Sequence, residues 1–550
     1  MEQARLFAAI ALSFIVIFAW QFFMVDQEAP PPEAPQAPAT ETVTATDTSV
    51  APMPMTEAAA PAPAAPAAPA RTARIITVET PLYIAKLSER GGVVTSFVLK
   101  DYRESAGKDS PLKSLISEDI TGGTLQAGFS GGNFPDLGQA VFSASVDGED
   151  LAVSGAPQDL VFSWTSPDGV IMEKRFLFSP DTYLIGLDIR LKNPTAIPVS
   201  GNLSLTLSGK SPGSDARYGF EGPSALIDGG LEQIKVKSIE DKNVYDGTIG
   251  WAAIEGRYFF SSIIPKDPGA ARLHLSVREE EALQSQYLLS DVTVDPATQK
   301  NVAFDLFLGP KSLKILSQYN NGLDKLIHFG MFDIIAKPCL WLMNYIYSVI
   351  PNYGVAIIIL TIVIKLILWP LGNKSYASMN QMKRLQPLMA EIREKYKDDK
   401  KKMNEELMGL YRTYKVNPMG GCLPMVLQIP VFFALYRMLY EAIELRHAPF
   451  IGWINDLSAP DRLFRFDVSI PFMEPPYGIP VLTIVMGATM LLQQKMSPPP
   501  GDPTQAKMMM LMPVVFTFIF INFSSGLVLY WLVNNILSIG QQYYIGRKNA

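Results

Sequence analysis

The sequence predicts a multi-domain chain in which a polytopic α-helical membrane core, with six transmembrane helices in total, is joined to an all-β sandwich domain. Only 18% of the 550 residues are charged, and the mean hydropathy is +0.14. A soluble domain has about 25% charged residues, so this balance is typical of a membrane protein that also carries soluble sequence. Long apolar runs lie before residue 25 and after residue 350, whereas residues 71–310 alternate short apolar runs with turns.

The N-terminal region predicts an uncleaved membrane anchor followed by a spacer. The apolar run Leu6–Met24 is long enough to span a bilayer, so we assign residues 1–25 to a signal-anchor transmembrane helix. No small-residue cleavage site follows it, and a cleaved signal peptide is the alternative. Residues 26–70 are rich in Pro and Ala and cannot bury a core, which predicts an extended linker.

Residues 71–310 are predicted to form the β-sandwich domain. Alternating runs occur at 74–78, 93–99, 183–191 and 203–207. Turn clusters separate such runs, as at Gly91-Gly92. Closely spaced strands and turns of this kind are typical of a sandwich or a related β architecture.

Residues 311–350 predict amphipathic helices at the membrane interface, and residues 351–550 predict a five-helix core. The aromatic residues before position 350 suit an interface. Five apolar spans follow, near 353–371, 423–443, 478–492, 510–523 and 527–545. With the anchor they make six.

Charge predicts the orientation of these spans. Residues 372–420 hold eleven Lys/Arg and six Asp/Glu, whereas residues 26–340 hold 26 and 39. The loop 495–509 and the C-terminal tail are also basic. Because basic loops stay in the cytoplasm, both termini are expected there and the β domain outside.

Lys365 is the sharpest functional feature, since it is a cation within an apolar span. It is either a lysine that snorkels to the interface or a cation held in a polar groove. No acidic residue lies within the last five spans except near their ends, which argues against a carboxylate proton relay. Neutral polar residues are available to line such a groove, among them Thr361, Gln428, Thr517, Asn534 and Ser538.

The segment 372–420 predicts a cytoplasmic helical hairpin, with helices over 379–396 and 400–414. It is either a solvated pair of helices or a docking surface for ribosomal RNA, anionic lipid or an emerging chain. The basic residues that would dock are Lys383, Arg384, Arg393, Lys395, Lys400, Lys401 and Lys402.

Composition and motifs argue against several other classes. The net charge of −6 does not fit a specific DNA-binding protein. Cys339 and Cys422 are too few for a four-cysteine metal site, and the three histidines show no HExxH spacing, so no metal or other cofactor is expected. Gly209-Lys210-Ser211 is similar to the end of a phosphate-binding loop, but Ser204 replaces its first glycine. We therefore predict neither an enzyme nor a nucleotide-binding protein.

Five motifs resemble those of the YidC membrane-protein insertases. In chain order they are Asn417–Pro424, Glu444–Phe450, Trp453–Ser458, Gln494–Pro498 and Ser525–Trp531. The anchor, spacer and β domain resemble the Gram-negative form, so the resemblance covers nearly the whole chain.

The resemblance implies a hydrophilic groove within a five-helix core of the bacterial inner membrane and a periplasmic β-supersandwich. It also implies nascent membrane proteins as substrates, with the Sec translocon, ribosomes and the phospholipid bilayer as partners. The family's groove cation is usually Arg, and Lys365 matches that position without the bidentate geometry of Arg. Tyr530 and Trp531 match an aromatic pair that contacts substrate. We expect the substrate helix to slide along the third and fifth spans, with contacts to Met425, Phe433 and Phe516.

Two other functions remain open from the residues. One is a transporter or channel with a periplasmic ligand-binding domain, which inverted repeats or a coupling carboxylate would favour. We find neither of these. The other is a membrane-anchored protein that binds or modifies carbohydrate, and modification would need a carboxylate pair in the β domain.

Overall fold

The computed structural model describes residues 72–116, 120, 122–131, 134–211, 219–278, 282–414, 416, 423–496 and 503–548. The expected anchor and linker lie outside these residues. The chain divides into two compact units, of which one contains the described residues Glu391–Leu410 and the other contains the rest.

The first β-sheet has the strand order β4-β3-β2-β1-β7, with β1 and β7 parallel and the other pairs antiparallel. The strand bounds are Ile75–Glu79 (β1), Tyr83–Ser88 (β2), Val93–Arg103 (β3), Leu112–Ile116 (β4) and Asp150–Ala152 (β7). The Gly91-Gly92 turn that joins β2 and β3 has positive φ at both residues, +75° and +55°, which only glycine adopts at low cost.

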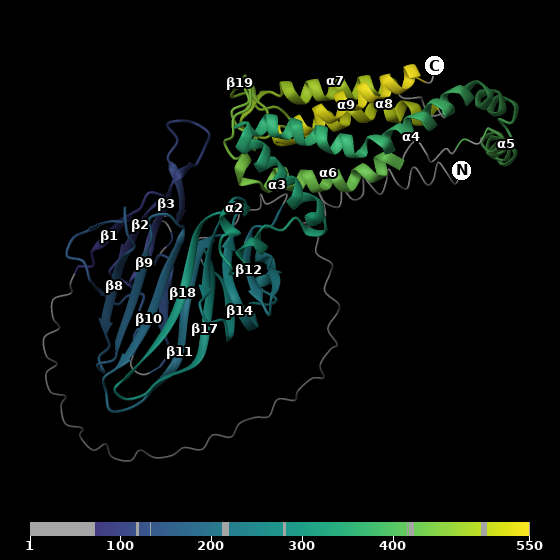
Figure 1. Cartoon of the computed structure of the whole chain (residues 1–550). Coiled ribbons are helices and arrows are strands. Elements are labelled where there is room, and N and C mark those ends of the chain that lie inside the picture. The colour runs from purple at the N-terminus through teal and green to yellow at the C-terminus, as the bar shows by residue number, and fades with distance from the viewer. Residues whose placement is uncertain are drawn as a thin grey trace, which may run out of the picture. The chain divides into compact units, whose positions relative to one another are not determined.

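The second sheet has the order β5-β11-β17-β16-β14-β15-β18-β10-β9-β8-β6, and β12 and β13 extend it from β14. Its long antiparallel strands lie side by side in Figure 1. The strand bounds are Gln126–Phe129 (β5), Ser143–Ala144 (β6), Gln158–Thr165 (β8), Ile171–Phe178 (β9), Leu184–Asn193 (β10), Val199–Lys210 (β11), Gly222–Ile227 (β12), Gly230–Gln233 (β13), Val244–Glu255 (β14), Phe259–Pro265 (β15), Ala270–Arg278 (β16), Ala282–Val294 (β17) and Thr298–Pro310 (β18).

Alternation of apolar and polar residues explains the core of this domain. In β10 the buried positions Ile185, Leu187, Ile189 and Leu191 alternate with half-buried ones. Such a strand turns every second side chain inward. Large rings such as Trp251 fill the interior. The prediction of an all-β, sandwich-like domain is confirmed.

The segment after the β domain contains short turns before its first long helix. These are α2 (Leu313–Leu316), η3 (Leu323–Leu326) and η4 (Gly330–Phe332), followed by α3 (Asp333–Val349). Gly322 and Gly330, at φ +75° and +68°, interrupt the helical pattern that the sequence indicated. Helix α3 is amphipathic, and it leaves Trp341 and Tyr345 stacked on its exposed side.

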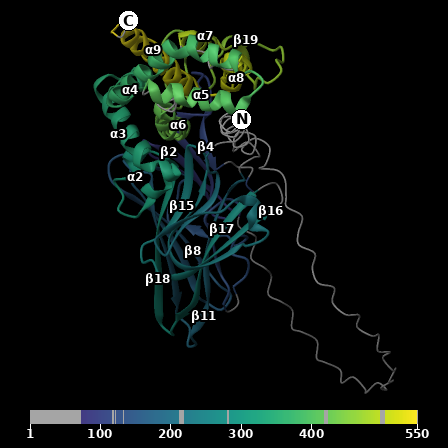
Figure 2. The same cartoon turned by 90° about the vertical axis from the view of Figure 1, so that its right-hand side faces the viewer.

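Long helices form one bundle after residue 350 (Figures 1 and 2). They are α4 (Tyr353–Lys395), α6 (Leu423–Glu441), α7 (Val481–Met496), α8 (Pro503–Phe520) and α9 (Ser525–Lys548). Helix α5 (Lys400–Thr413) follows α4 in the chain, and a small hairpin of β19 (Leu463–Phe466) and β20 (Tyr477–Ile479) precedes α7. Helix α4 is continuous, whereas the sequence predicted a span and a separate helix from residue 379.

Segments far apart in the chain meet at one end of the bundle. Ser525 N donates to Ala459 O at 2.8 Å, and Asn352 Nδ2 donates to Phe450 O at 3.1 Å. The starts of α4 and α9 and the segment 442–480 therefore lie together. Since α4 and α9 both begin at this end, they run parallel.

The predicted count of six spans is not confirmed. Among the described residues, α4 alone has the length and the apolar character needed to cross a membrane, and residues 509–520 of α8 form a shorter apolar helix.

Candidate functional site

The amino group of Lys365 is tied to helix α9. Lys365 Nζ donates to Ser538 Oγ at 2.6 Å, and Ser538 Oγ donates to the Asn534 carbonyl at 2.7 Å. Because a hydroxyl has one hydrogen, the second bond leaves the oxygen lone pairs for the ammonium. No carboxylate in the described part of the chain forms an ion pair with this lysine. The site therefore holds a cation against a neutral hydroxyl.

Lys365 lies at the boundary between the interior of the bundle and an apolar outer face. Thr361, one turn earlier, is buried, and its Oγ1 donates to Ile357 O at 2.6 Å. Leu366 and Ile367, the next two residues, are 60% and 72% exposed. Lys365 itself is half-buried. Helix α4 thus turns Lys365 toward α9, and Leu366 and Ile367 outward.

Polar side chains recur at helical spacing along α9, at Tyr530, Asn534, Ser538 and Gln541. Gln541 Nε2 donates to Trp369 O at 3.1 Å and to Asn373 Oδ1 at 3.0 Å. The sequence reasoning missed Gln541 and Asn373. Helical spacing could have identified both residues, because Gln541 lies one turn after Ser538 on α9 and Asn373 lies about two turns after Lys365 on α4.

Tyr530 is the first of these polar residues on α9, and its contact with Gln428 connects α9 to α6. The Tyr530 side chain is buried and hydrogen-bonds with Gln428. These two predicted groove residues are therefore brought together, on helices more than 90 positions apart in sequence.

Trp531 belongs to an aromatic cluster between helices. Its ring lies edge-on to Phe432 at a centroid distance of 4.7 Å, and the Phe520 and Phe516 rings lie at 5.1 and 6.4 Å. The structure thus places Phe516 of α8 beside the predicted substrate-contacting Trp531.

Of the remaining expected contacts, Phe433 reaches this cluster through Phe432, whose ring it meets edge-on at 5.4 Å. Phe433 stacks on Phe332 of η4 at 5.9 Å. Thr517 Oγ1 donates to Pro513 O of its own helix at 2.7 Å and faces Gly487 of α7. The side chain of Met425 lies outside the described residues.

Most of the expected docking residues are exposed. Lys383 and Arg384 are exposed on α4, Arg393 is half-buried, and the side chain of Lys400 lies outside the described residues. In the smaller unit, the Lys395 and Lys402 ammonium groups each lie 5.4 Å from the centre of the Tyr396 ring. Lys401 is also exposed there.

A polar junction between the β domain and the bundle was not predicted. Arg257 Nε and Nη2 donate to the Tyr440 carbonyl near the end of α6, at 3.0 and 2.8 Å. Glu444 accepts hydrogen bonds from Ser312 at 3.3 Å and from Asn344 at 3.5 Å. Burial raises the pKa of the Glu444 carboxyl. No local pattern in the sequence pairs these positions.

Within the described residues, no three His, Cys, Asp or Glu side chains come together as a metal site would require.

Comparison with protein families matches almost the whole described chain. Residues 345–550 match the family described as "60Kd inner membrane protein", and residues 75–342 match the "YidC periplasmic domain". The boundary between the two matches falls within α3.

Curated bacterial proteins are similar to this chain over nearly their full length. "Membrane protein insertase YidC" of Syntrophus aciditrophicus is 41% identical over 562 residues, covering 98% of each chain. The protein of the same name from Pelobacter propionicus is 41% identical over 551 residues, covering 99% of each. A solved structure, "Active YidC insertase crystal structure with the first transmembrane domain resolved", is 19% identical with a TM-score of 0.37, covering 86% of this chain and 93% of that chain.

Proposed function

The chain belongs to the YidC family of membrane-protein insertases, and we propose on this basis that it moves nascent membrane proteins into the inner membrane. The observation that carries the proposal is 41% identity to curated insertases over 98% or more of the chain. Insertases of this family are not enzymes, so the prediction that this chain is not an enzyme is confirmed. The same relatives favour an insertase over the transporter or channel that the sequence left open.

The proposed mechanism lowers the cost of carrying polar residues through hydrocarbon. A polar group that loses water without gaining a hydrogen bond costs several kcal/mol. A hydrophilic groove beside Lys365 would offer such groups water and hydrogen-bonding partners partway across the membrane. The half-buried position of Lys365 and its hydroxyl partner Ser538 support this role, because one bond among the described residues leaves the ammonium two hydrogens for a visiting carboxylate.

We propose that the apolar substrate helix leaves along α6 and α8. Phe516 beside Trp531 supports a contact surface on α8, and Phe433, edge-on to Phe432, supports one on α6. Solvation of the substrate helix by lipid would drive release, so no nucleotide is needed. Thr361, Gln428, Thr517, Tyr530 and Asn534 stay proposed groove residues.

Substitution of Lys365 tests the electrostatic part of this mechanism. We expect Lys365→Gln and Lys365→Glu to lower insertion of a substrate with an acidic translocated tail, while Lys365→Arg retains it. If the ion pair between Lys365 and the acidic tail contributes about 1 kcal/mol, its removal corresponds to a roughly fivefold loss of insertion. The measurement is protease protection of the translocated tail in proteoliposomes that contain the purified variant.

The matched control is Lys374→Gln, which removes an exposed lysine from the same helix. It should insert the substrate as well as the wild type does. Equal insertion by Lys365→Gln, Lys365→Glu and the wild type would refute the role of the charge. Loss of insertion for an uncharged tail as well would instead indicate damage to the groove.

We further propose the ribosome and the Sec translocon as partners and a cytoplasmic location for both termini. The exposed basic residues of α4 and α5 support contact with an anionic partner such as ribosomal RNA. The excess of Lys/Arg in residues 372–420 supports their cytoplasmic location.

A further inference from the structure

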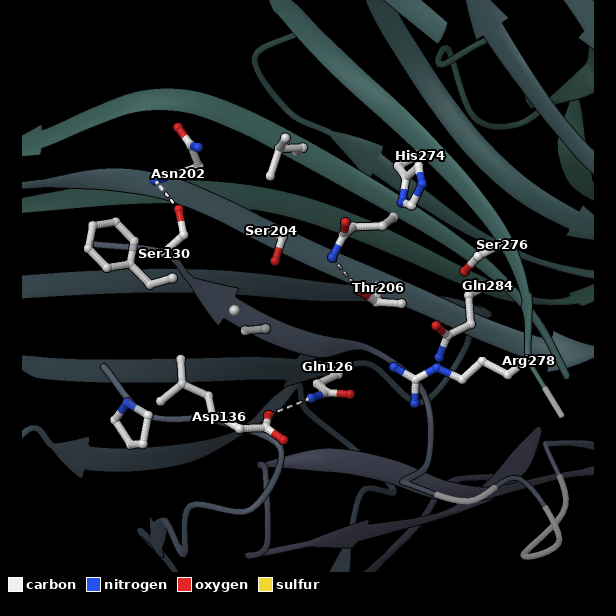
Figure 3. A pocket seen from close by; sticks show the side chains of 17 residues that line it. Gln126, Ser130, Asp136, Asn202, Ser204, Thr206, His274, Ser276, Arg278 and Gln284 are labelled. Atoms are coloured by element: carbon white, nitrogen blue, oxygen red, sulfur yellow. Dashed lines mark hydrogen bonds between the residues drawn. The ribbon is translucent and has the colours of Figure 1, made fainter. Parts of the chain in front are cut away.

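The β domain contains a cavity of about 760 Å³ over one face of strands β5, β11, β17 and β16 (Figure 3). Ser130 and Pro135, which follow β5 in the chain, also line the cavity. Ser130 N donates to Asn202 O at 3.0 Å, and Asn202 N donates to Ser130 Oγ at 3.1 Å. Ser130 is therefore held against β11 of the sheet by two hydrogen bonds. This volume falls within the roughly 300–1,000 Å³ of small-molecule sites.

Strand register gathers polar side chains into a row across the cavity floor. Gln126 pairs with Thr206, Thr206 with Gln286, and Gln286 with His274. Strands lie about 4.8 Å apart, so the row extends about 14 Å. The opposite face of β11 carries the buried Leu205 and Leu207. The sequence thus assigns one face of these strands to the core and the other to the cavity.

The glutamine amides on this floor keep unused hydrogen-bonding capacity. Gln286 donates to Thr206 at 3.4 Å, Gln284 to Ser208 at 3.3 Å and Gln126 to Asp136 at 3.3 Å. All three distances exceed the usual 2.7–3.2 Å, so these bonds are weak. Each amide has a second hydrogen and a carbonyl oxygen. In the described part of the chain no bond uses these oxygens, and Figure 3 shows the Gln126 and Gln284 side chains directed into the same space.

The charged and polar groups of the cavity limit the class of ligand that it can bind. Among the described lining residues there is one carboxylate, Asp136, and one guanidinium, Arg278, so these residues carry no excess charge that would select an ion. Its floor is mostly amide and hydroxyl, whereas recognition of an extended peptide uses an open sheet edge and pockets for alternate side chains. Neutral amides and hydroxyls match a ligand that is itself neutral and rich in hydroxyl groups.

We propose that this cavity binds a short neutral oligosaccharide. The second amide hydrogens and the amide oxygens of Gln284 and Gln286 would pair with sugar hydroxyls, and Thr206 would contribute from the neighbouring strand. Asp136 is the one carboxylate among the described lining residues, and glycoside hydrolysis requires two. The site therefore binds the sugar without cleaving it. This binding is separate from the proposed insertion of membrane proteins.

Titration calorimetry on the full chain tests the proposal. The protein is held in dodecyldimethylamine oxide, because detergents with sugar headgroups would compete for the cavity. The probes are maltotetraose, cellotetraose and chitotetraose, and we expect at least one to bind with a dissociation constant below about 1 mM. Gln286→Ala should weaken that binding about tenfold, the effect of losing one or two hydrogen bonds. Thr206→Val, which keeps the shape of the side chain, should also weaken it.

The matched control is Gln299→Ala on β18, which removes an exposed glutamine outside the cavity and should leave binding unchanged. The melting temperature of each variant shows whether it has folded, and insertion by Gln286→Ala should equal that of the wild type. Failure of all three sugars to bind the wild-type protein would overturn the proposal. Binding of a neutral polar tetrapeptide that Gln286→Ala abolishes, without sugar binding, would overturn it in favour of a peptide site.

Discussion

At the scale of single residues, Lys174 is a fully buried lysine in the β domain. Its side chain is fully buried on β9, and Nζ donates to the carbonyl oxygens of Gly91, Gly92 and Leu125, the last at 2.9 Å. The lysine therefore bonds the β2–β3 turn and the residue before β5 to β9. Burial lowers the pKa of Lys174 to about 7.

This pKa predicts a pH dependence of stability. In the unfolded chain the lysine keeps its ordinary pKa of about 10.5, so between pH 7 and pH 10.5 the unfolded state binds more protons. The free energy of unfolding should then rise with pH in this window, by up to about 1.4 kcal/mol per pH unit. Below pH 7 the contribution no longer changes with pH. We expect the melting temperature of the wild type to rise more between pH 7 and pH 9 than that of Lys174→Met.

The control for this measurement is Lys300→Met, which alters an exposed lysine of β18 in the same domain. It should keep the pH dependence of the wild type. Parallel pH curves for the wild type and Lys174→Met would contradict the lowered pKa.

Lys365 also illustrates how far the sequence predicts a site. A charge within an apolar run is visible without a structure, because such a residue needs a special environment. Its partner Ser538 lies 173 positions away, and only the packing of α4 against α9 selects it from the other polar residues of the spans. The polar character of the site was predictable, whereas its pairwise contacts were not.

At the scale of elements, the positions of the helices were predictable and their continuity was not. The expected spans coincide within a few residues with α6 and α9 and, less closely, with α7 and α8. The sequence reading ended the first of the five spans at residue 371, after Pro370. Proline usually ends a helix. However, Pro370 and Pro387 both lie inside α4, as membrane proteins allow where neighbouring groups satisfy the freed carbonyls.

Helices α7 and α8 approach closely at a glycine, which allows a test of their packing. A Cβ atom on Gly487 would lie 2.2 Å from Thr517 Oγ1. Small residues permit such close contacts between membrane helices. We expect Gly487→Ala to lower the melting temperature of the full chain. Thr517→Ala should partly restore it in the double variant, because the clashing oxygen is then absent.

The double-mutant cycle isolates this contact, with an expected coupling of about 1 kcal/mol in favour of the double variant. Gly540→Ala in α9 is the control, since nothing lies within 4 Å of a Cβ atom there. It should leave stability unchanged or raise it slightly. Additive effects of Gly487→Ala and Thr517→Ala would show that the two helices do not meet at these residues.

At the scale of the whole molecule, the net charge of −6 is a sum of opposite regions. Residues 26–340 hold 39 acidic and 26 basic residues, whereas residues 372–420 hold six and eleven. The segment 442–480, which lies at the end of the bundle where α4 and α9 begin, holds five acidic and three basic residues. The acidic segment 442–480 therefore lies at the end of the bundle that the charge pattern predicts to face the periplasm.

Cysteine labelling tests this orientation. In a variant with Cys339 and Cys422 replaced by serine, a single cysteine is introduced at Val468 or at Tyr414, which are 69% and 53% exposed. Because basic segments are retained in the cytoplasm, a membrane-impermeant maleimide should label Val468→Cys in intact spheroplasts. It should label Tyr414→Cys only after lysis. Labelling of Tyr414→Cys in intact spheroplasts would reverse the orientation, and with it the proposed cytoplasmic location of both termini.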